Sequence, residues 1–164
     1  MEDPMYGVER IERIGGGGFG EVWRVRYLGS EEAWKYIPIQ PGIIERTGRE
    51  AIHARRVNHR NVVRVLDVLR LEDHYVLRME LIRGRDFFRV VSEDGLIPPE
   101  EAVAYGIQIA QALAHAHSQD VVHLDLKPHN LILTEDGAKV MVTDFGISAS
   151  LAMDCGRPLE AAGT

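Results

Sequence analysis

The sequence predicts an α+β fold in which a small antiparallel sheet with one helix precedes the start of a helical unit. Two observations lead to this prediction. Before residue 82, most apolar segments are short, rich in β-branched and aromatic residues, and separated by turn-forming residues, as is typical of strands. After Gly84 the pattern changes, and residues 99–117 carry apolar side chains at helical spacing. We therefore expect two units, residues 1–82 and 83–164.

The first unit contains strand-like segments on both sides of a glycine run, then one helical segment, then two further strands. Glu72-Asp73 provides a hairpin-type connection between the last two strands. The expected strands are residues 6–14, 21–27, 33–39, 62–71 and 74–81, and the expected helix is residues 44–57.

The second unit begins with a short helix, expected over residues 86–92 and ended by a turn at 93–95. The longest helix starts at Pro98-Pro99-Glu100-Glu101, because proline is tolerated in a first turn and acidic groups favour the positive end of the helix dipole. Strand-like runs at 131–133 and 139–143 predict a hairpin after it. The apolar stripe of the long helix comprises Val103, Ile107, Ala110, Leu113 and Ala114.

Composition is that of an ordinary globular protein, with 45% hydrophobic and 27% charged residues. The net charge of -6 argues against a nucleic-acid partner bound through a broad basic face. Cys155 is the single cysteine, so no intrachain disulfide can form. The first residues do not have the pattern of a signal peptide, and no apolar run in the sequence reaches membrane-spanning length. Glu2 stands where N-myristoylation requires glycine. We therefore expect a cytoplasmic protein without a membrane partner.

The chemistry of the chain is concentrated after the long helix. Asp125, Lys127 and Asn130 share one short loop, and the following hairpin returns Asp144 toward them. Carboxylate and carboxamide oxygens suit Mg²⁺, the ammonium group suits phosphate, and a carboxylate can receive a hydroxyl proton. This set of groups favours phosphoryl transfer.

The glycine run offers a second phosphate-binding element, since Gly15, Gly17 and Gly20 let backbone N–H groups approach phosphate oxygens. A dinucleotide-binding turn is disfavoured because a strand composition follows instead of a helix. A Walker loop is disfavoured because Glu21-Val22 stands where Lys-Ser/Thr is needed. A hairpin tip without any ligand remains the alternative.

Strand alternation places Lys35 on one face with Ala33 and Ile37, opposite Trp34 and Tyr36. Small and apolar neighbours favour a lysine in a cleft, although an exposed strand lysine is the commoner case.

Several segments resemble those of the eukaryotic-type protein kinase family. Gly15–Val22 resembles its glycine-rich loop, Ala33-Trp34-Lys35 its lysine strand, and His59–Val63 the segment after its first helix. His123–Asn130 and Asp144-Phe145-Gly146 resemble its catalytic loop and metal-binding motif. The Lys-Pro pair in the catalytic loop is similar to that of the serine/threonine branch.

The resemblance implies a two-lobed kinase fold with an incomplete helical lobe, ATP and Mg²⁺ as cofactors, and a protein hydroxyl as phosphate acceptor. Glu50 is then the helix glutamate that pairs with Lys35, although a solvated helix charge is the alternative. His123 is expected to have a structural role. The implied residues are Asp125, Lys127, Lys35 and Glu50 for catalysis, Gly15, Gly17, Gly20, Val22, Ala33, Lys35, Met79, Glu80, Ile82 and Ile132 for ATP, and Asn130 and Asp144 for the metal.

Three further histidines, His115, His117 and His129, lie close together in sequence but lack the spacing of a metal site, so we interpret them as helix and loop residues.

Two departures from the family pattern affect the interpretation. Leu124 stands where most members have the arginine that binds a phosphorylated activation segment, which argues against that form of control. The chain ends inside the segment resembling the activation segment, so the long helix is expected to expose its stripe and to favour self-association or a partner chain. An ATP-binding module without transfer activity and a fragment unable to fold alone are the alternative hypotheses.

Overall fold

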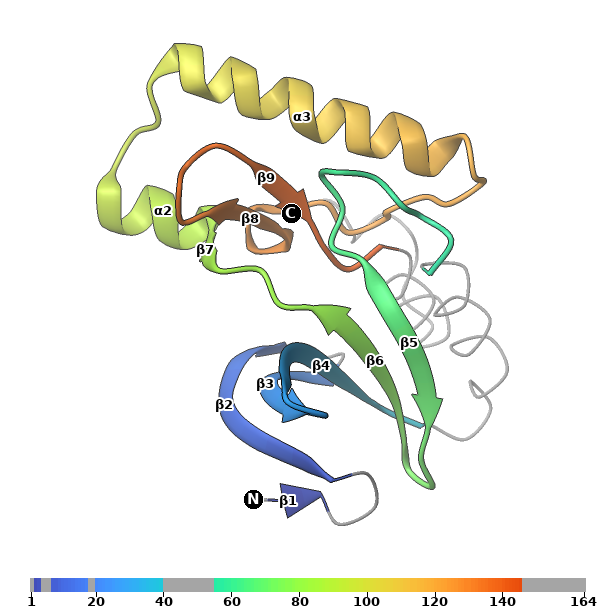
Figure 1. The fold of residues 1–164 in the computed structure, drawn as a ribbon. Coiled ribbons are helices and arrows are strands. Elements are labelled where there is room, and N and C mark those ends of the chain that lie inside the picture. Colours follow the sequence, from blue (N-terminus) through green and yellow to red (C-terminus); the bar gives the residue numbers. More distant parts are fainter. Residues whose placement is uncertain (1, 4–6, 18–19, 40–54, 146–164) are drawn as a thin grey trace.

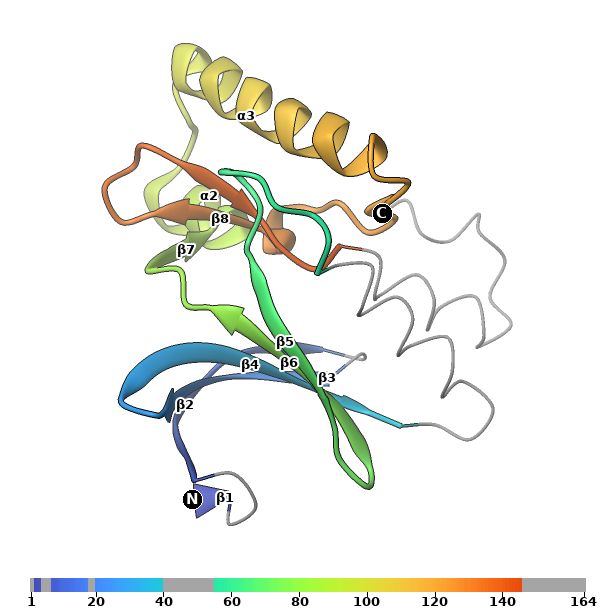
Figure 2. The same ribbon diagram turned by 45° about the vertical axis from the view of Figure 1, so that its right-hand side comes forward.

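The computed structural model describes residues 2–3, 7–17, 20–39 and 55–145; Glu50, Gly146 and Cys155 are among the residues outside these ranges. A six-stranded antiparallel sheet lies below a three-stranded antiparallel sheet, and helix α3 (Pro99–His117) extends along the far side of the smaller sheet (Figure 1). Figure 2 shows the smaller sheet between α3 and the larger sheet. The predicted α+β fold class, a small antiparallel sheet followed by a partly helical unit, is confirmed.

The larger sheet has the strand order β1-β2-β3-β4-β6-β5. Its alternation is the one predicted, because Ala33 and Ile37 belong to one buried cluster while Trp34 and Tyr36 belong to another on the opposite face. The strands are β1 (Glu2–Asp3), β2 (Val8–Gly17), β3 (Gly20–Tyr27), β4 (Ser30–Pro38), β5 (Val65–Arg70) and β6 (His74–Glu80).

Several predicted boundaries in this unit differ from the structure. Strand β2 continues to Gly17, beyond the expected end at residue 14, and β4 begins at Ser30, before the expected start at residue 33. The strand expected over 62–71 begins only at Val65, because Val62 and Val63 leave the sheet and run beside β9 instead. The helix expected over 44–57 falls mostly outside the described residues, and its last three positions, 55–57, form a turn and irregular backbone.

The smaller sheet comprises β7 (Gly84–Asp86), β8 (Leu131–Thr134) and β9 (Val140–Val142). Strand β7 was not predicted, because Gly-Arg-Asp carries no apolar alternation. Asp86 also begins helix α2 (Phe87–Asp94), where its Oδ1 accepts a hydrogen bond of 3.0 Å from the Arg89 backbone N–H. Gly95 ends that helix with a φ of 87°. A short 3₁₀ helix, η1 (Pro128–Asn130), precedes β8.

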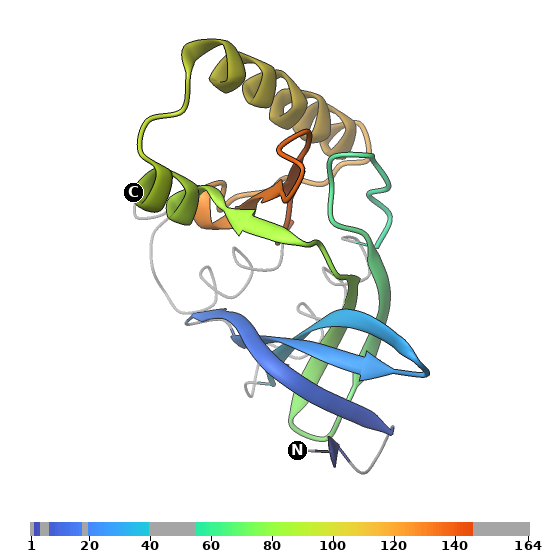
Figure 3. The same cartoon turned by 60° about the vertical axis from the view of Figure 1, so that its left-hand side comes forward.

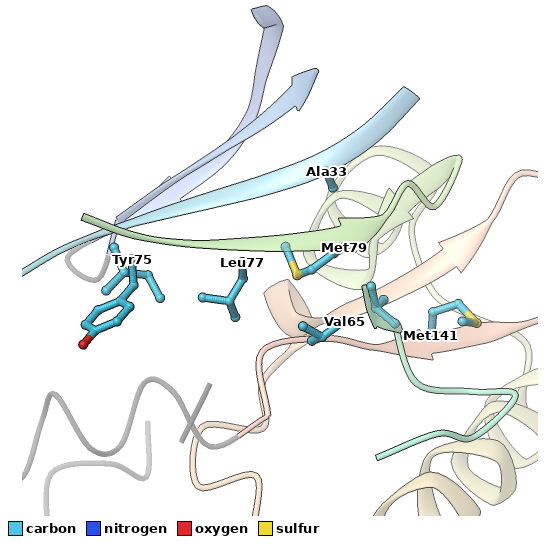
Figure 4. Close-up of a cluster of buried hydrophobic side chains, with 8 residues drawn as sticks. Ala33, Val65, Tyr75, Leu77, Met79 and Met141 are labelled. Atoms are coloured by element: carbon cyan, nitrogen blue, oxygen red, sulfur yellow. The ribbon is translucent and has the colours of Figure 1, made fainter. Parts of the chain in front are cut away.

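An apolar cluster joins the two sheets. Leu77 and Met79 project from β6 toward Val65 and toward Met141 of β9 (Figure 4). A second cluster lies between α3 and β9 and includes Phe145. The smaller sheet is therefore attached to the larger one by packing as well as by the chain connection after β6.

Helix α3 carries apolar residues on two faces, which the predicted stripe did not separate. Tyr105, Ala112 and Ala116 are buried against the smaller sheet (Figure 3 shows the helix above it). Val103 and Ile107 belong to the predicted stripe and are 64% and 54% exposed. Pro99 stands in the first turn, as expected. No helix in the described ranges is both long and apolar enough to span a membrane.

Candidate active site

The loop between α3 and β8 is fixed by residues that alternate between the interior and the surface. Val121 and His123 are buried, whereas Val122, Leu124 and Leu126 are exposed. Inward side chains therefore hold the loop against β9, and the alternate side chains face solvent.

His123 connects the two halves of the candidate site. Its Nδ1 accepts a hydrogen bond of 3.3 Å from the Asp125 backbone N–H, so Nε2 carries the proton that is donated to the Thr143 carbonyl at 2.8 Å. The ring also contacts Phe145, with 4.7 Å between ring centroids. Burial lowers the pKa of His123, which keeps the imidazole neutral and preserves this donor–acceptor arrangement. These contacts agree with the structural role expected for His123.

Asp125, Lys127 and Asn130 form one hydrogen-bonded group. Lys127 Nζ lies 2.8 Å from Asp125 Oδ2, and Asn130 Nδ2 donates to the same oxygen at 3.2 Å. Asn130 Nδ2 also donates to the Asp125 carbonyl at 2.8 Å, so its Oδ1 points away from Asp125. The backbone N–H of Thr143 donates to the Asn130 carbonyl at 3.0 Å, which links this group to the segment carrying Asp144.

Asp144 reaches across to the larger sheet. Its Oδ1 lies 2.8 Å from Lys35 Nζ, and the two side chains are 19% and 6% exposed. Asp144 has a φ of 65°, and Leu124 in the neighbouring loop has a φ of 62°. Left-handed conformations cost non-glycine residues roughly 1–2 kcal/mol each. Such strain is typical of functional sites.

The glycine-rich hairpin lies next to Lys35 through the strand register. Gly15 is opposite Val22, and Val22 is opposite Lys35 in the next strand pair. Two strand spacings of about 4.8 Å each separate the hairpin backbone from the lysine. Gly17 is opposite Gly20 at the tip of the hairpin.

Gly20 is required for a reason that the sequence did not reveal. Its φ is 124°, and a Cβ atom there would lie 2.2 Å from the Tyr36 carbonyl oxygen of β4. A Cβ at Gly15 would only make ordinary contact with Val22 at 3.6 Å. Close packing of the hairpin on β4 therefore explains Gly20.

The residues predicted to surround the adenine belong to a single apolar cluster. Ala33 and Met79 are buried in it, and Val22, Ile82 and Ile132 pack against it as partly buried side chains. Ala33 is directly opposite Met79 in the β4–β6 register. The cluster thus gathers side chains from both sheets.

The connection between the sheets begins at Glu80. Its backbone N–H donates to the Arg64 carbonyl at 3.0 Å, and its Oε1 accepts from the Arg64 N–H at 2.7 Å. These bonds fix the end of β6 where the chain leaves the larger sheet. Of the candidate catalytic, ATP-binding and metal-binding residues named from the sequence, Glu50 alone lies outside the described ranges.

Two residues at this site were not identified from the sequence. Asp86 is opposite Ile132 in the β7–β8 register, which puts a carboxylate at the edge of the apolar cluster. Phe88, 54% exposed, stacks on His129 with 4.4 Å between ring centroids, beside the loop that carries Asp125. The sequence assigned Asp86 only to the start of a short helix, and Phe88 to its interior.

The donor set fits a magnesium ion that also binds phosphates. Mg²⁺ is typically held by one or two protein carboxylates and completes its shell with water and substrate phosphate oxygens. Asp144 supplies a carboxylate and Asn130 an amide oxygen, both within one hydrogen-bonded unit. Among the described residues no group of three or more His, Cys, Asp or Glu side chains gathers in a way that would bind a metal without a substrate.

Comparison with known families decides what this arrangement belongs to. The family model described as "Protein kinase domain" matches residues 8–159, which is most of the chain. The chain belongs to the protein kinase family.

Curated members of the family with similar sequences include serine/threonine kinases from several bacteria. A probable serine/threonine-protein kinase of Clostridium perfringens is 36% identical over 149 residues, covering 87% of this chain and 22% of that protein. Serine/threonine-protein kinase PrkC of Bacillus subtilis is 35% identical over 145 residues, covering 85% and 22%. PkaA of Streptomyces coelicolor is 36% identical over 156 residues, covering 84% and 29%. This kinase-family chain therefore spans less than a third of the length of these relatives.

Proposed function

We propose that this chain carries the groups with which a serine/threonine protein kinase transfers a phosphoryl group from Mg-ATP to a protein hydroxyl. The ion pair between Lys35 and Asp144 is the observation that carries the proposal, because it brings a buried cation of the larger sheet to a carboxylate that follows the last strand of the smaller sheet. We also propose that the two units divide at residues 82 and 83, between β6 and β7.

The nucleotide is bound between the sheets. The adenine lies among Val22, Ala33, Met79 and Ile132, which is supported by their membership of one apolar cluster. The backbones of Glu80 and Ile82 hydrogen-bond to its edge. Backbone N–H groups at Gly15, Gly17 and Gly20 approach the phosphates.

Lys35 binds the α- and β-phosphates, and Glu50 holds its side chain in place. Asn130 and Asp144 bind Mg²⁺, which neutralises phosphate charge when it is bound. Lys35 and Asp144 form an ion pair with each other. When Mg-ATP binds, this contact would be replaced by one between Lys35 and phosphate and one between Asp144 and the metal. The pair therefore keeps both charges in the geometry that a metal–triphosphate requires.

Asp125 accepts the proton of the acceptor serine or threonine hydroxyl. The hydroxyl oxygen then forms a bond with the γ-phosphorus, the bond between that phosphorus and the β–γ bridging oxygen breaks, and ADP leaves with the electron pair. Lys127, 2.8 Å from Asp125, stabilises the charge on the transferred group. Positioning and charge stabilisation supply the rate enhancement.

Transfer of labelled phosphate from ATP to a generic acceptor protein in Mg²⁺ tests this function. The Asp125→Asn variant keeps the size of the side chain and one acceptor oxygen but removes the base. Transfer by the wild-type chain above the level of this variant, with nucleotide affinity retained within a few-fold, is the expected result. Equal phosphorylation by both proteins would reject the role of Asp125.

An ATP-binding module without transfer activity is the second candidate. The exposed face of α3 favours it, since Val103 and Ile107 are 64% and 54% exposed and would need a cover in a stable protein. Self-association or a partner chain that covers this face is part of the proposal, as are a cytoplasmic location and a protein substrate. Mg-ATP binding without transfer above the Asp125→Asn level would favour this candidate.

A further inference from the structure

Asn61 is a buried polar residue that the proposed mechanism does not use. It is 2% exposed and lies in the segment that precedes β5. Its Nδ2 donates to the Val140 carbonyl at 2.9 Å and to Gln108 Oε1 at 2.7 Å. Its backbone carbonyl accepts from the Val142 N–H at 2.8 Å. One residue thus binds both ends of strand β9.

Gln108 of α3 completes the same edge. Its Oε1 accepts a hydrogen bond of 3.0 Å from the Val140 N–H, and its Nε2 donates to the Ala138 carbonyl at 3.3 Å. The fourth group of the edge, the Val142 carbonyl, accepts from the Val63 N–H at 2.9 Å. The N–H and carbonyl groups of Val140 and Val142 on the edge away from β8 are therefore all hydrogen-bonded. Side chains bind both groups of Val140, where a neighbouring strand would otherwise do so.

This edge determines where Asp144 lies. Strand β9 has only three residues and ends at Val142, two positions before Asp144. On its other edge it pairs with β8, which follows directly after Asn130. A three-residue strand held on both edges has little freedom to shift, so the carboxylate of Asp144 stays in register with Asn130 and Lys35.

We propose that Asn61 and Gln108 are positioning residues that set the place of Asp144 relative to Asn130 and Lys35. This inference rests on the proposed function, because it concerns the metal and nucleotide of the same site. Substituting a residue that orients a metal ligand typically lowers metal affinity by about 10- to 100-fold.

Gln108 offers a matched pair of substitutions. Gln108→Glu keeps an acceptor for the Val140 N–H and for Asn61 Nδ2 and loses only the 3.3 Å hydrogen bond to the Ala138 carbonyl. Gln108→Met keeps the approximate shape and removes the acceptor as well. Asn61→Ala removes the donor from the other side. Asn58→Ala, at an exposed position of the same segment, is the control for substitution as such. Val8→Ala, in a buried cluster away from β9, is the control for lost stability.

Two measurements on the full 164-residue chain test the inference. The first is the Mg²⁺ concentration that gives half of the thermal shift produced by a saturating non-hydrolysable ATP analogue. We expect about a tenfold increase or more for Gln108→Met and Asn61→Ala, and a wild-type value for Gln108→Glu, Asn58→Ala and Val8→Ala. The second is hydrogen exchange at the Val140 amide, which should become faster in Gln108→Met but not in Gln108→Glu.

This inference, but not the proposed function, would be overturned if the wild-type chain showed the nucleotide-dependent thermal shift and Gln108→Met needed the same Mg²⁺ concentration for half of that shift as Gln108→Glu. An increase in Val8→Ala equal to that in Gln108→Met would do the same, since it would trace the effect to general stability. A wild-type chain that shows no nucleotide response would overturn the proposed function and this inference with it.

Discussion

Lys35 Nζ and Asp144 Oδ1 lie 2.8 Å apart, although Lys35 belongs to β4 of the larger sheet and Asp144 follows β9 of the smaller sheet, 109 positions later in the sequence. Both side chains are largely removed from solvent, at 6% and 19% exposure. Removing one partner of a buried pair leaves an uncompensated charge, which typically costs about 3–5 kcal/mol. The pair therefore contributes to the connection between the sheets in the nucleotide-free protein.

A double-mutant cycle measures this contribution. We expect Lys35→Met and Asp144→Asn to lower the free energy of unfolding by less together than the sum of the single effects, with a coupling of at least about 1 kcal/mol. The exposed pair formed by Arg26 and Glu9, 2.7 Å apart at 50% and 53% exposure, is the matched control and should couple by less than about 1 kcal/mol. Equal coupling in both cycles would show that the buried pair has no special role.

Gly20 provides a test of the hairpin. Gly20→Ala should destabilise the chain by about 3 kcal/mol or more, because the new Cβ would clash with the Tyr36 carbonyl in addition to the strain of a φ of 124°. Gly29→Ala is the matched control, since Gly29 has a φ of 82° but no atom within 4 Å of a built Cβ. Its expected cost is about 1–2 kcal/mol. Chemical denaturation compares the two; a smaller effect at Gly20 than at Gly29 would contradict the packing argument.

The lowered pKa of Glu32 predicts that the stability of the fold depends on pH. Burial raises the pKa of Glu32, but hydrogen bonds from Arg78 and Trp34 outweigh burial and lower it below the ordinary value of 4.5. A lowered carboxyl pKa means that the folded state binds the proton more weakly than the unfolded state. The stabilisation is therefore complete above about pH 4.5 and is lost as the pH falls through the folded-state pKa.

Glu32→Gln should remove this component. We expect a loss of about 3 kcal/mol near neutral pH, where Arg78 keeps only the 4.0 Å ion pair with Asp67 among the described residues, and a smaller difference from wild type as the pH falls through the lowered pKa of Glu32. Unfolding by denaturant between pH 3 and pH 7 measures the difference. A difference that stays constant across this range would exclude Glu32 as the titrating group.

The exposed face of α3 predicts association. Ile107→Lys should shift the chain toward the monomer, because burying an isoleucine side chain contributes about 1.5–3 kcal/mol and a lysine at the interface would oppose it. Ala102→Lys, at an exposed position on a different side of the helix, is the control for added charge. Sedimentation velocity over a range of concentrations distinguishes the variants. Identical association of wild type and Ile107→Lys would exclude this face as the contact.

Sequence patterns were sufficient for much of the fold, because alternation and helical spacing reflect burial directly. Lys35 was placed on the face of Ala33 and Ile37, and that face is buried as expected. The start of the long helix at Pro99 was likewise predictable from its first-turn residues. The order of motifs also identified the family.

The remaining features depend on contacts between distant segments. Val62 and Val63 have strand-forming side chains, but tertiary hydrogen bonds to β9 decide that they leave the larger sheet. Gly84–Asp86 forms a strand only because β8 offers an edge to pair with. The sequence could not show which face of α3 is buried, because Val103 and Tyr105 are both apolar. Only packing against the smaller sheet buries Tyr105 and leaves Val103 exposed. Asn61 carried no local signal of its hydrogen bonds to β9.

Calorimetric titration with a non-hydrolysable ATP analogue, with and without Mg²⁺, tests most directly whether the two sheets bind one metal–triphosphate together. We predict a single site in the wild-type chain, a loss of affinity of about 10- to 100-fold in Lys35→Met under both conditions, and a comparable loss in Asp144→Asn only when Mg²⁺ is present. Wild-type affinity in either variant in the presence of Mg²⁺ would contradict the account.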